Sequence, residues 1–252
     1  MPYSQFAYFY DKLQQGVDYE GIVRFIDKQV RRFGGRRGIL LDMACGTGTL
    51  AELLAGAGYD VIGTDSSAEM LSVALDKKYD SGLPIQYLDQ SMTELDMFGT
   101  IDVTVCTLDS INHLDSLDEI KKAFERVSLF AFPDGMFIFD VNTPYKHSEI
   151  LGNNTYVYDI DGVYCVWQNE YNEADGSVSI ALDFFEEGED GRYERFCEGF
   201  KEIAFDDKTI SAALEEAGFE ILDRLDDYTD TPIGEATQRI VYVCRKTARN
   251  GG

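Results

Sequence analysis

An acid and three small residues occupy alternate positions in residues 41–51, which read LDMACGTGTLA. The series is Asp42, Ala44, Gly46 and Gly48, and small residues at such positions let the backbone approach a bound ligand closely. Read from Gly46 to Ala51, the same stretch also satisfies the dinucleotide pattern G-x-G-x-x-G/A. The stretch therefore indicates a cofactor loop, and two classes of cofactor compete for it.

Asp42 distinguishes the two cofactor classes by its charge. In a dinucleotide site this region faces a pyrophosphate held at a helix N-terminus, and a carboxylate in that partly desolvated cleft would repel it. S-adenosylmethionine (SAM) has no phosphate and carries an ammonium and a sulfonium, so an acid at the end of the strand favours its binding. We therefore expect a SAM loop, with the match at Ala51 reflecting helix packing.

Asp65 follows Gly46 by 19 residues, at the end of the second predicted strand. A carboxylate at this place can accept hydrogen bonds from both hydroxyls of a ribose, which supports an adenosine ligand without separating NAD from SAM. The alternative is an ordinary helix N-terminal acid before Ser66. With the glycine loop in place, the ligand role is preferred.

The two histidines, His113 and His147, are the candidate general bases. Methyl transfer is an in-line displacement that needs alignment and exclusion of water, and a hydroxyl or ammonium acceptor also needs a base. His113 lies just beyond the fourth predicted strand, where ligands bind in parallel sheets. We take His113 as the catalytic candidate, with a structural role in the following turn as the alternative. His147 has the weaker signal.

The elements that position these residues alternate between strand and helix. Apolar runs at 38–43, 59–65, 84–88, 101–106 and 135–141 read as buried strands, with helical patterns at about 47–57, 116–130 and from Ser66, where Glu69 completes a capping box. The pattern predicts an α/β fold with a doubly wound, mostly parallel seven-stranded sheet. The final strands are FEILDRL and QRIVYVCR, after a helix at 208–217 opened by Asp206 or Asp207.

Residues 154–205 break this alternation with four aromatic, strand-like runs separated by the turns DIDG, EADG and GEDG. We interpret them as an antiparallel meander inserted after the fifth strand. The predicted organisation is a SAM-binding core with an N-terminal helical cover at 1–150, a substrate lid at 151–205, and the remainder of the core at 206–246.

The net charge of −24, from 46 acids and 22 bases, makes nucleic acid an unfavourable partner, because phosphate binding requires a positive surface. The same field favours cationic or neutral small substrates. No apolar run approaches the roughly 18 residues of a membrane span, the N-terminus does not read as a signal peptide, and the five cysteines show no C-x-x-C pair. These features predict a cytoplasmic protein without a metal, as a monomer or homodimer.

The stretch LLDMACGTGTLAELLAGAGYDVIGTDSSAEML strongly resembles the first two SAM-binding motifs of the class I, Rossmann-like methyltransferases. IQYLDQSMTEL, FGTIDVTVCTLDSINHL and FAFPDGMFIFDVNTPYK resemble the later motifs in order, so the resemblance covers essentially the whole chain. It is closest to small-molecule members, including sugar N-methyltransferases, in which an antiparallel insertion follows the fifth strand and roofs the active site.

This resemblance implies roles for individual residues. Asp42 would bind the methionine amino end of SAM, directly or through water, with Ala44, Gly46 and Gly48 lining that end. Asp65 would hold the ribose, and Met70 would pack near the adenine. The backbone at Leu108 would approach the methionine moiety.

The resemblance is weaker at the adenine. The family usually has an acid before a small or apolar residue there, whereas this chain has Ser91 followed by Met92; Asp89 is the alternative in another register. The N-terminal YSQFAYFYDKL matches a first helix that covers the cofactor, with Tyr10 as the best candidate and Tyr3 and Phe6 as others. Packing of these rings on the sheet is the competing interpretation.

The leading functional hypothesis is a SAM-dependent methyltransferase acting on a small soluble acceptor, an amine being one such acceptor. Two alternatives remain: a methyltransferase acting on RNA or protein, and a non-catalytic SAM-binding protein, since no base is certain from the sequence.

Overall fold

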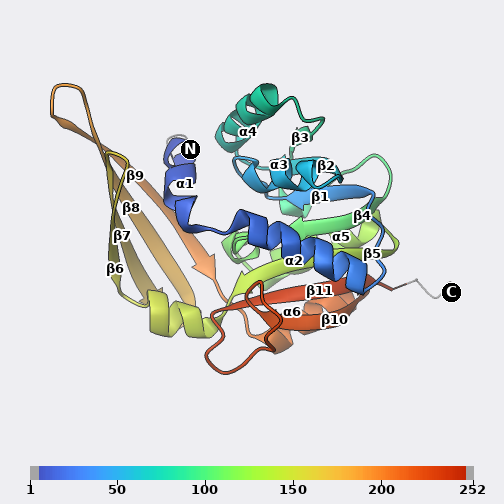
Figure 1. The fold of residues 1–252 in the computed structure, drawn as a ribbon. Coiled ribbons are helices and arrows are strands. Elements are labelled where there is room, and N and C mark those ends of the chain that lie inside the picture. Colours follow the sequence, from blue (N-terminus) through green and yellow to red (C-terminus); the bar gives the residue numbers. More distant parts are fainter. Residues whose placement is uncertain (1–5, 248–252) are drawn as a thin grey trace.

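The computed structural model describes residues 6–247, and its central element is a seven-stranded sheet in the order β10-β11-β5-β4-β1-β2-β3 (Figure 1). The strands from β1 to β5 pair in parallel, whereas β11 runs antiparallel to both β5 and β10. This topology confirms the predicted fold class. The strands are β1 (Ile39–Met43), β2 (Asp60–Asp65), β3 (Gln86–Asp89), β4 (Ile101–Cys106), β5 (Ala131–Asn142), β10 (Phe219–Asp226) and β11 (Arg239–Lys246).

Helices cover both faces of this sheet because its inner strands are apolar on both sides. On one face, α2 (Tyr19–Arg32) and α3 (Thr49–Gly56) pack against side chains such as Leu40 and Val103. On the other, α5 (Leu117–Phe130) and α6 (Asp207–Glu216) pack against side chains such as Leu41 and Phe137. Since side chains alternate along a strand, Asp42 points to the same face as Leu40.

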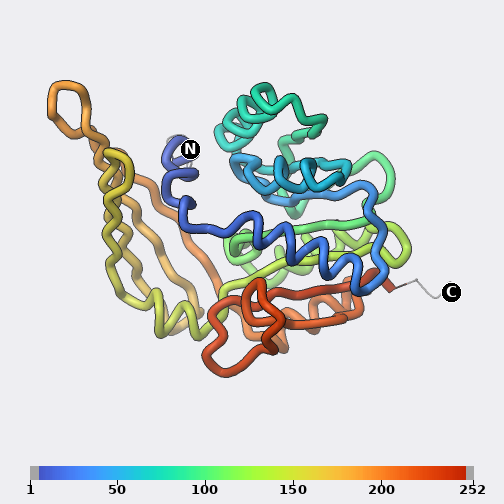
Figure 2. The backbone as a smooth tube through the Cα atoms, viewed as in Figure 1, coloured from blue at the N-terminus to red at the C-terminus, as the bar shows by residue number. Residues whose placement is uncertain are grey.

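A second sheet stands beside the first and is antiparallel, as the aromatic runs predict. Its order is β6 (Thr155–Ile160), β7 (Val163–Asn172), β8 (Ser177–Glu187) and β9 (Tyr193–Ile203). The turn between β8 and β9 projects farthest from the core (Figure 2). A short helical segment, η4 (Lys146–Leu151), connects β5 to this sheet.

Helix α1 (Phe6–Leu13) lies between the second sheet and α4 (Ala68–Ser81) (Figure 1). Phe9 stacks on Phe184 of β8 with ring centroids 4.7 Å apart, and Phe6 and Met70 belong to the same buried cluster. The N-terminal helix therefore joins the inserted sheet to the core above the carboxyl ends of β1 and β2.

Two local predictions differ from the structure. The cap of α4 is Ser67 rather than Ser66, because Ser67 Oγ accepts from the backbone N–H of Met70 at 3.2 Å. Helix α2 was not predicted, although Ile22, Phe25 and Ile26 have helical spacing. At the end of the insertion, Asp206 is the cap of α6.

Within residues 6–247, no helix combines the length and the apolar character that crossing a bilayer would require.

Candidate active site

The strand order reverses between β1 and β4, and ligands of open α/β sheets bind at such a switch point. Both loops leaving these strands contain non-glycine residues in the left-handed region: Ala44 (φ 58°) after β1, and Leu108 and Asp109 (both φ 56°) after β4. Strained backbone of this kind clusters at functional sites. A ligand-binding site is therefore expected at the switch point.

The loop after β1 uses its two glycines differently. Gly46 has φ 53°, and its open side faces Tyr10, whose Cε1 would lie 3.8 Å from an added Cβ. An added Cβ on Gly48 (φ 76°) would collide with the hydroxyl of Tyr87 and lie 2.9 Å from Cβ of Ala74. Gly46 thus keeps the cleft open, whereas Gly48 allows α3 to pack against neighbouring side chains.

Asp65 connects the ends of β1 and β2. Its Oδ2 accepts from the N–H of Gly46 at 2.8 Å, and its Oδ1 accepts from the N–H of Ser67 at 2.9 Å. Burial raises the pKa of the Asp65 carboxyl, and these backbone donors oppose that rise. An ionised carboxylate has about four acceptor positions, so Asp65 retains capacity for a donor from a ligand.

Asp42 is a buried acid with an unpaired oxygen. Its residue surface is 1% exposed, and its Oδ2 has no hydrogen-bond partner among the described residues. Burial, followed by repulsion from Asp65, raises the pKa of Asp42 to about 8. A buried polar atom of this kind needs a partner, and a cationic group would supply one.

Asp140 of β5 binds the loop that follows β4. The backbone N–H groups of Leu108 and Asp109 each donate to this carboxylate at 2.7 Å. Tyr228 and Arg239 also donate to Asp140, and Arg239 binds Asp109 at 2.6 Å. Burial raises the pKa of Asp140, an effect that Arg239 opposes. The arrangement fixes the strained loop through paired charges.

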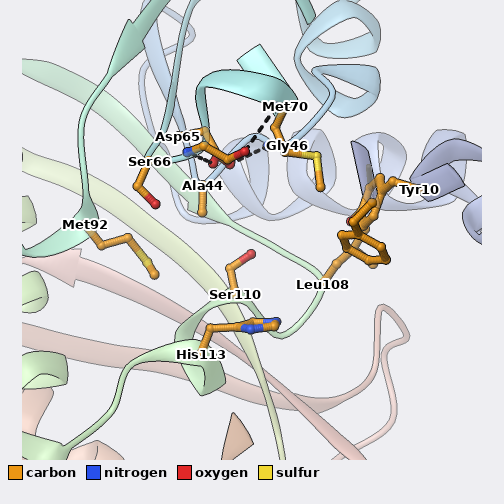
Figure 3. A pocket seen from close by; sticks show the side chains of 12 residues that line it. Tyr10, Ala44, Gly46, Asp65, Ser66, Met70, Met92, Leu108, Ser110 and His113 are labelled. Carbon is orange, nitrogen blue, oxygen red and sulfur yellow. Dashed lines mark hydrogen bonds between the residues drawn. The ribbon is translucent and has the colours of Figure 1, made fainter. Parts of the chain in front are cut away.

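A pocket opens where these loops meet, and Figure 3 shows its walls. Asp65, Ala44 and Gly46 lie on one side and Ser110 and His113 on the opposite side, with Met92, Met70 and Tyr10 around the rim (Figure 3). Nine of the residues singled out from the sequence line it: Phe6, Tyr10, Ala44, Gly46, Asp65, Met70, Met92, Leu108 and His113.

The remaining predicted residues lie elsewhere. Asp42 lines an adjoining pocket that shares Tyr10, Ala44 and Leu108 with the first. Gly48 and Ser91 are not among the lining residues of either pocket, and Ser91 Oγ lies 3.3 Å from Oγ1 of Thr93. Tyr3 lies outside the described residues.

A second cavity, of about 260 Å³, continues from the first beneath the inserted sheet. It shares Phe6, Tyr10, Leu108 and His113 with the first pocket, so His113 stands at the junction of the two. The new walls combine aromatic rings with charged groups: Tyr158, Trp167, Phe200, Asp109, Lys146, Glu202 and Arg239.

Glu202 is the residue of this cavity that sequence reasoning missed and that offers chemistry. Its side chain is 4% exposed, and Oε1 lies 4.0 Å from Nε2 of His113. Its Oε2 accepts from Nδ2 of Asn142 at 3.0 Å and lies 3.3 Å from Nε2 of His147. Glu202 follows Phe196 and Phe200 at alternate positions of β9, and an acid in line with these rings was the signal available in the sequence.

Asp109, His113 and Glu202 also bring potential metal-ligating atoms within 4.8 Å of one another. Asp109 is already paired with Arg239 at 2.6 Å, and Lys146 adds a second positive charge to the same cavity. Asp109 is therefore not free to serve as a metal ligand, and we assign no metal role to this trio.

Comparison with known proteins agrees with this site. Residues 40–135 match a family model described as a methyltransferase domain. A Geobacillus sp. (strain WCH70) protein with a methyltransferase name is 34% identical over 248 residues, spanning 98% of this chain and 100% of that protein. YqeM of Bacillus subtilis (strain 168), also named as a methyltransferase, is 31% identical over 98% of each chain.

Solved structures agree with the sequence relatives. An S-adenosylmethionine-dependent methyltransferase from Clostridium acetobutylicum superposes with a TM-score of 0.88 at 36% identity, covering 98% of this chain and 99% of that one. SAM-bound CalS10, an amino pentose methyltransferase from Micromonospora echinaspora, shares the fold with a TM-score of 0.75 at 19% identity, covering 95% of this chain and 96% of that one.

The fold is therefore that of a Rossmann-like methyltransferase. The chain belongs to the SAM-dependent methyltransferase family, and its cofactor is SAM. This confirms the predicted enzyme class and cofactor.

Proposed function

We propose that this enzyme transfers a methyl group from SAM to the nitrogen of a small amine bound in the cavity beneath the inserted sheet. The observation that carries the proposal is this cavity, which adjoins the switch-point pocket and has His113 at the junction. Its volume of about 260 Å³ is on the order of nine water molecules at roughly 30 Å³ each. A small molecule fits such a space.

The cavity walls favour a basic acceptor. Glu202 presents a buried carboxylate whose nearest cationic candidates are the two histidines, and Trp167 and Phe200 supply aromatic faces. A carboxylate and aromatic rings both attract a cationic amine. Arg239 and Lys146 do not reverse this preference, because Arg239 is paired with Asp109 and Asp140 and burial lowers the pKa of Lys146.

The residues around the first pocket suit SAM. Asp42 offers its unpaired Oδ2 to the amino group of the methionine end, and Asp65 offers acceptor positions to the ribose hydroxyls. Met70 and Met92 provide apolar surface for the adenine, and Tyr10 of α1 covers the opening. Ser91 bonds locally to Thr93 and does not line the pocket, so the proposal assigns it no contact with the adenine.

When bound, SAM supplies an electrophilic methyl group on a positively charged sulfur. The chain aligns the acceptor, keeps water out and accepts the proton that the nitrogen releases. Helix α1 and the inserted sheet share a buried cluster above the site, and together they exclude water from it. His113, whose side chain is 30% exposed, is the candidate proton acceptor at the junction.

The test is a methyl-transfer assay that measures S-adenosylhomocysteine formation over a panel of small primary and secondary amines, amino sugars included. The matched controls are hydroxyl and carboxyl compounds of the same carbon skeletons, together with bulk tRNA and a denatured protein. We expect product only with amines, and a His113→Gln variant that binds SAM normally but turns over more slowly. Product formed only with tRNA or protein would overturn the proposal.

A further inference from the structure

Glu202 lies between the only two histidines of the chain. His113 comes from η3 (Ser110–His113), His147 from η4 and Glu202 from β9, three segments far apart in the sequence. The carboxylate oxygens lie 4.0 Å from Nε2 of His113 and 3.3 Å from Nε2 of His147. His147 is fully buried, so this contact is shielded from solvent.

The surroundings of His147 determine where protons can lie. Its Nδ1 is 3.1 Å from the carbonyl oxygen of Gly176, and a carbonyl only accepts, so Nδ1 carries the hydrogen of that bond. The Nε2 atom then faces Oε2 of Glu202 at 3.3 Å, without the alignment of a hydrogen bond among the described residues. His147 therefore packs against Glu202 without donating a hydrogen bond to it.

Further contacts fix Glu202 so that its other oxygen faces the cavity. Asn142 Nδ2 donates to Oε2 at 3.0 Å, and Asn142 is itself held by Asn112, whose Oδ1 accepts from the Asn142 N–H at 2.8 Å. The Oε1 atom of Glu202 therefore faces His113. The imidazole also packs against Phe200, with ring centroids 5.1 Å apart.

Other charges act on His113 as well. Asp65 at the end of β2 and Asp109 before η3 both interact electrostatically with the ring, while Lys146 and Arg239 lie near Asp109. These groups lie on segments other than β9. Removing the charge of Glu202 alone therefore isolates its influence on the imidazole.

We propose that Glu202 is a positioning residue whose carboxylate stabilises the protonated form of His113. The inference rests on the proposed function. One proton leaves the acceptor ammonium for Nε2 of His113, and the electron pair of the broken N–H bond stays on the nitrogen as its nucleophilic lone pair. Glu202 then faces a positive imidazolium, which a carboxylate favours.

The experiment is a pH titration by NMR of the protein labelled with ¹⁵N at histidine, in the absence of any acceptor. Only two imidazoles contribute, and His113→Gln and His147→Gln variants assign them. The test variant is Glu202→Gln, in which the amide can donate to His147 while its carbonyl faces His113. The matched control is Glu194→Gln, which removes the same charge from an exposed position of β9, roughly 26 Å along the strand.

We expect the titration midpoint of His113 to fall by about one pH unit in Glu202→Gln and to remain unchanged in Glu194→Gln. Glu202→Asp keeps the charge but withdraws it by about one methylene, so the midpoint should fall by less than in Glu202→Gln, a graded response that a merely structural role would not produce. A His113 midpoint within about 0.3 pH unit of the wild type in whichever of these two variants folds would overturn the inference.

This experiment is independent of SAM and of the acceptor. Failure of the amine panel would count against the proposed function alone, whereas failure of the titration would count against the role of Glu202 alone.

Discussion

Asp42→Asn is predicted to change stability and cofactor binding in opposite directions. Burial raises the pKa of Asp42 to about 8 in the folded chain, from about 3.8 in the unfolded chain. Between these values the folded protein holds the proton and the unfolded chain has released it. The contribution of Asp42 to the free energy of unfolding is therefore fully present below about pH 3.8 and is lost as the pH rises toward 8.

The size of this effect follows from the same two pKa values. Each pH unit above about 3.8 lowers the free energy of unfolding by about 1.4 kcal/mol, so at pH 7 the loss is at most about 4 kcal/mol. Local relaxation reduces such values, and we expect Asp42→Asn to recover about 1 to 4 kcal/mol at pH 7. For a chain of this length that raises the melting temperature by several degrees.

Binding of SAM should weaken in the same variant. The neutral amide cannot pair with the amino group as a carboxylate can, and losing a charge-assisted hydrogen bond of about 1.5–3 kcal/mol lowers affinity on the order of 10- to 100-fold. In the wild type at pH 7, SAM binding also releases the proton of Asp42. The binding enthalpy measured by calorimetry should therefore differ between Tris and phosphate buffers in the wild type and much less in Asp42→Asn.

The matched control is Asp89→Asn, which makes the same change at an exposed acid at the end of β3. It should alter stability by less than about 0.5 kcal/mol and leave the buffer dependence intact. An Asp42→Asn variant that melts below the wild type and binds SAM with unchanged affinity would refute the reasoning.

Three further predictions follow from single contacts. Asp65→Ala removes the acceptor for the ribose and the contact with the Gly46 N–H, so calorimetry should show SAM affinity reduced by at least about 10-fold; unchanged affinity would contradict the assignment. Phe9→Ala removes the stacked contact with Phe184, and hydrogen exchange should show faster exchange in α1 with the sheet core unaffected. Arg239→Met leaves Asp140 unpaired, and urea unfolding should show a loss of about 3–5 kcal/mol at pH 7; a loss below about 1 kcal/mol would be inconsistent with this role.

Much of the lining of the switch-point pocket could be predicted because its residues are close in sequence to the strands that position them. Asp42 lies near the end of β1 and Asp65 ends β2, and the parallel sheet brings those ends together. The roles of individual residues could not be predicted as well from the sequence. Gly48 is needed for packing against Tyr87 and Ala74, a contact that no local pattern of glycines indicates.

The acceptor cavity could not be derived from local patterns. Glu202 is 89 residues after His113, and their meeting depends on how the inserted sheet packs against the core. Arg239 reaches the loop after β4 from the last strand of the chain. Such long-range pairings follow from tertiary packing, which the alternation of apolar residues within one strand does not specify.

The most direct test of the account is a crystal structure of the enzyme with S-adenosylhomocysteine bound. The account predicts the amino group of the ligand at Asp42, its ribose hydroxyls at Asp65, and its sulfur facing the cavity bordered by His113 and Glu202. A ligand bound with its ribose away from Asp65, or with its sulfur directed away from that cavity, would contradict it.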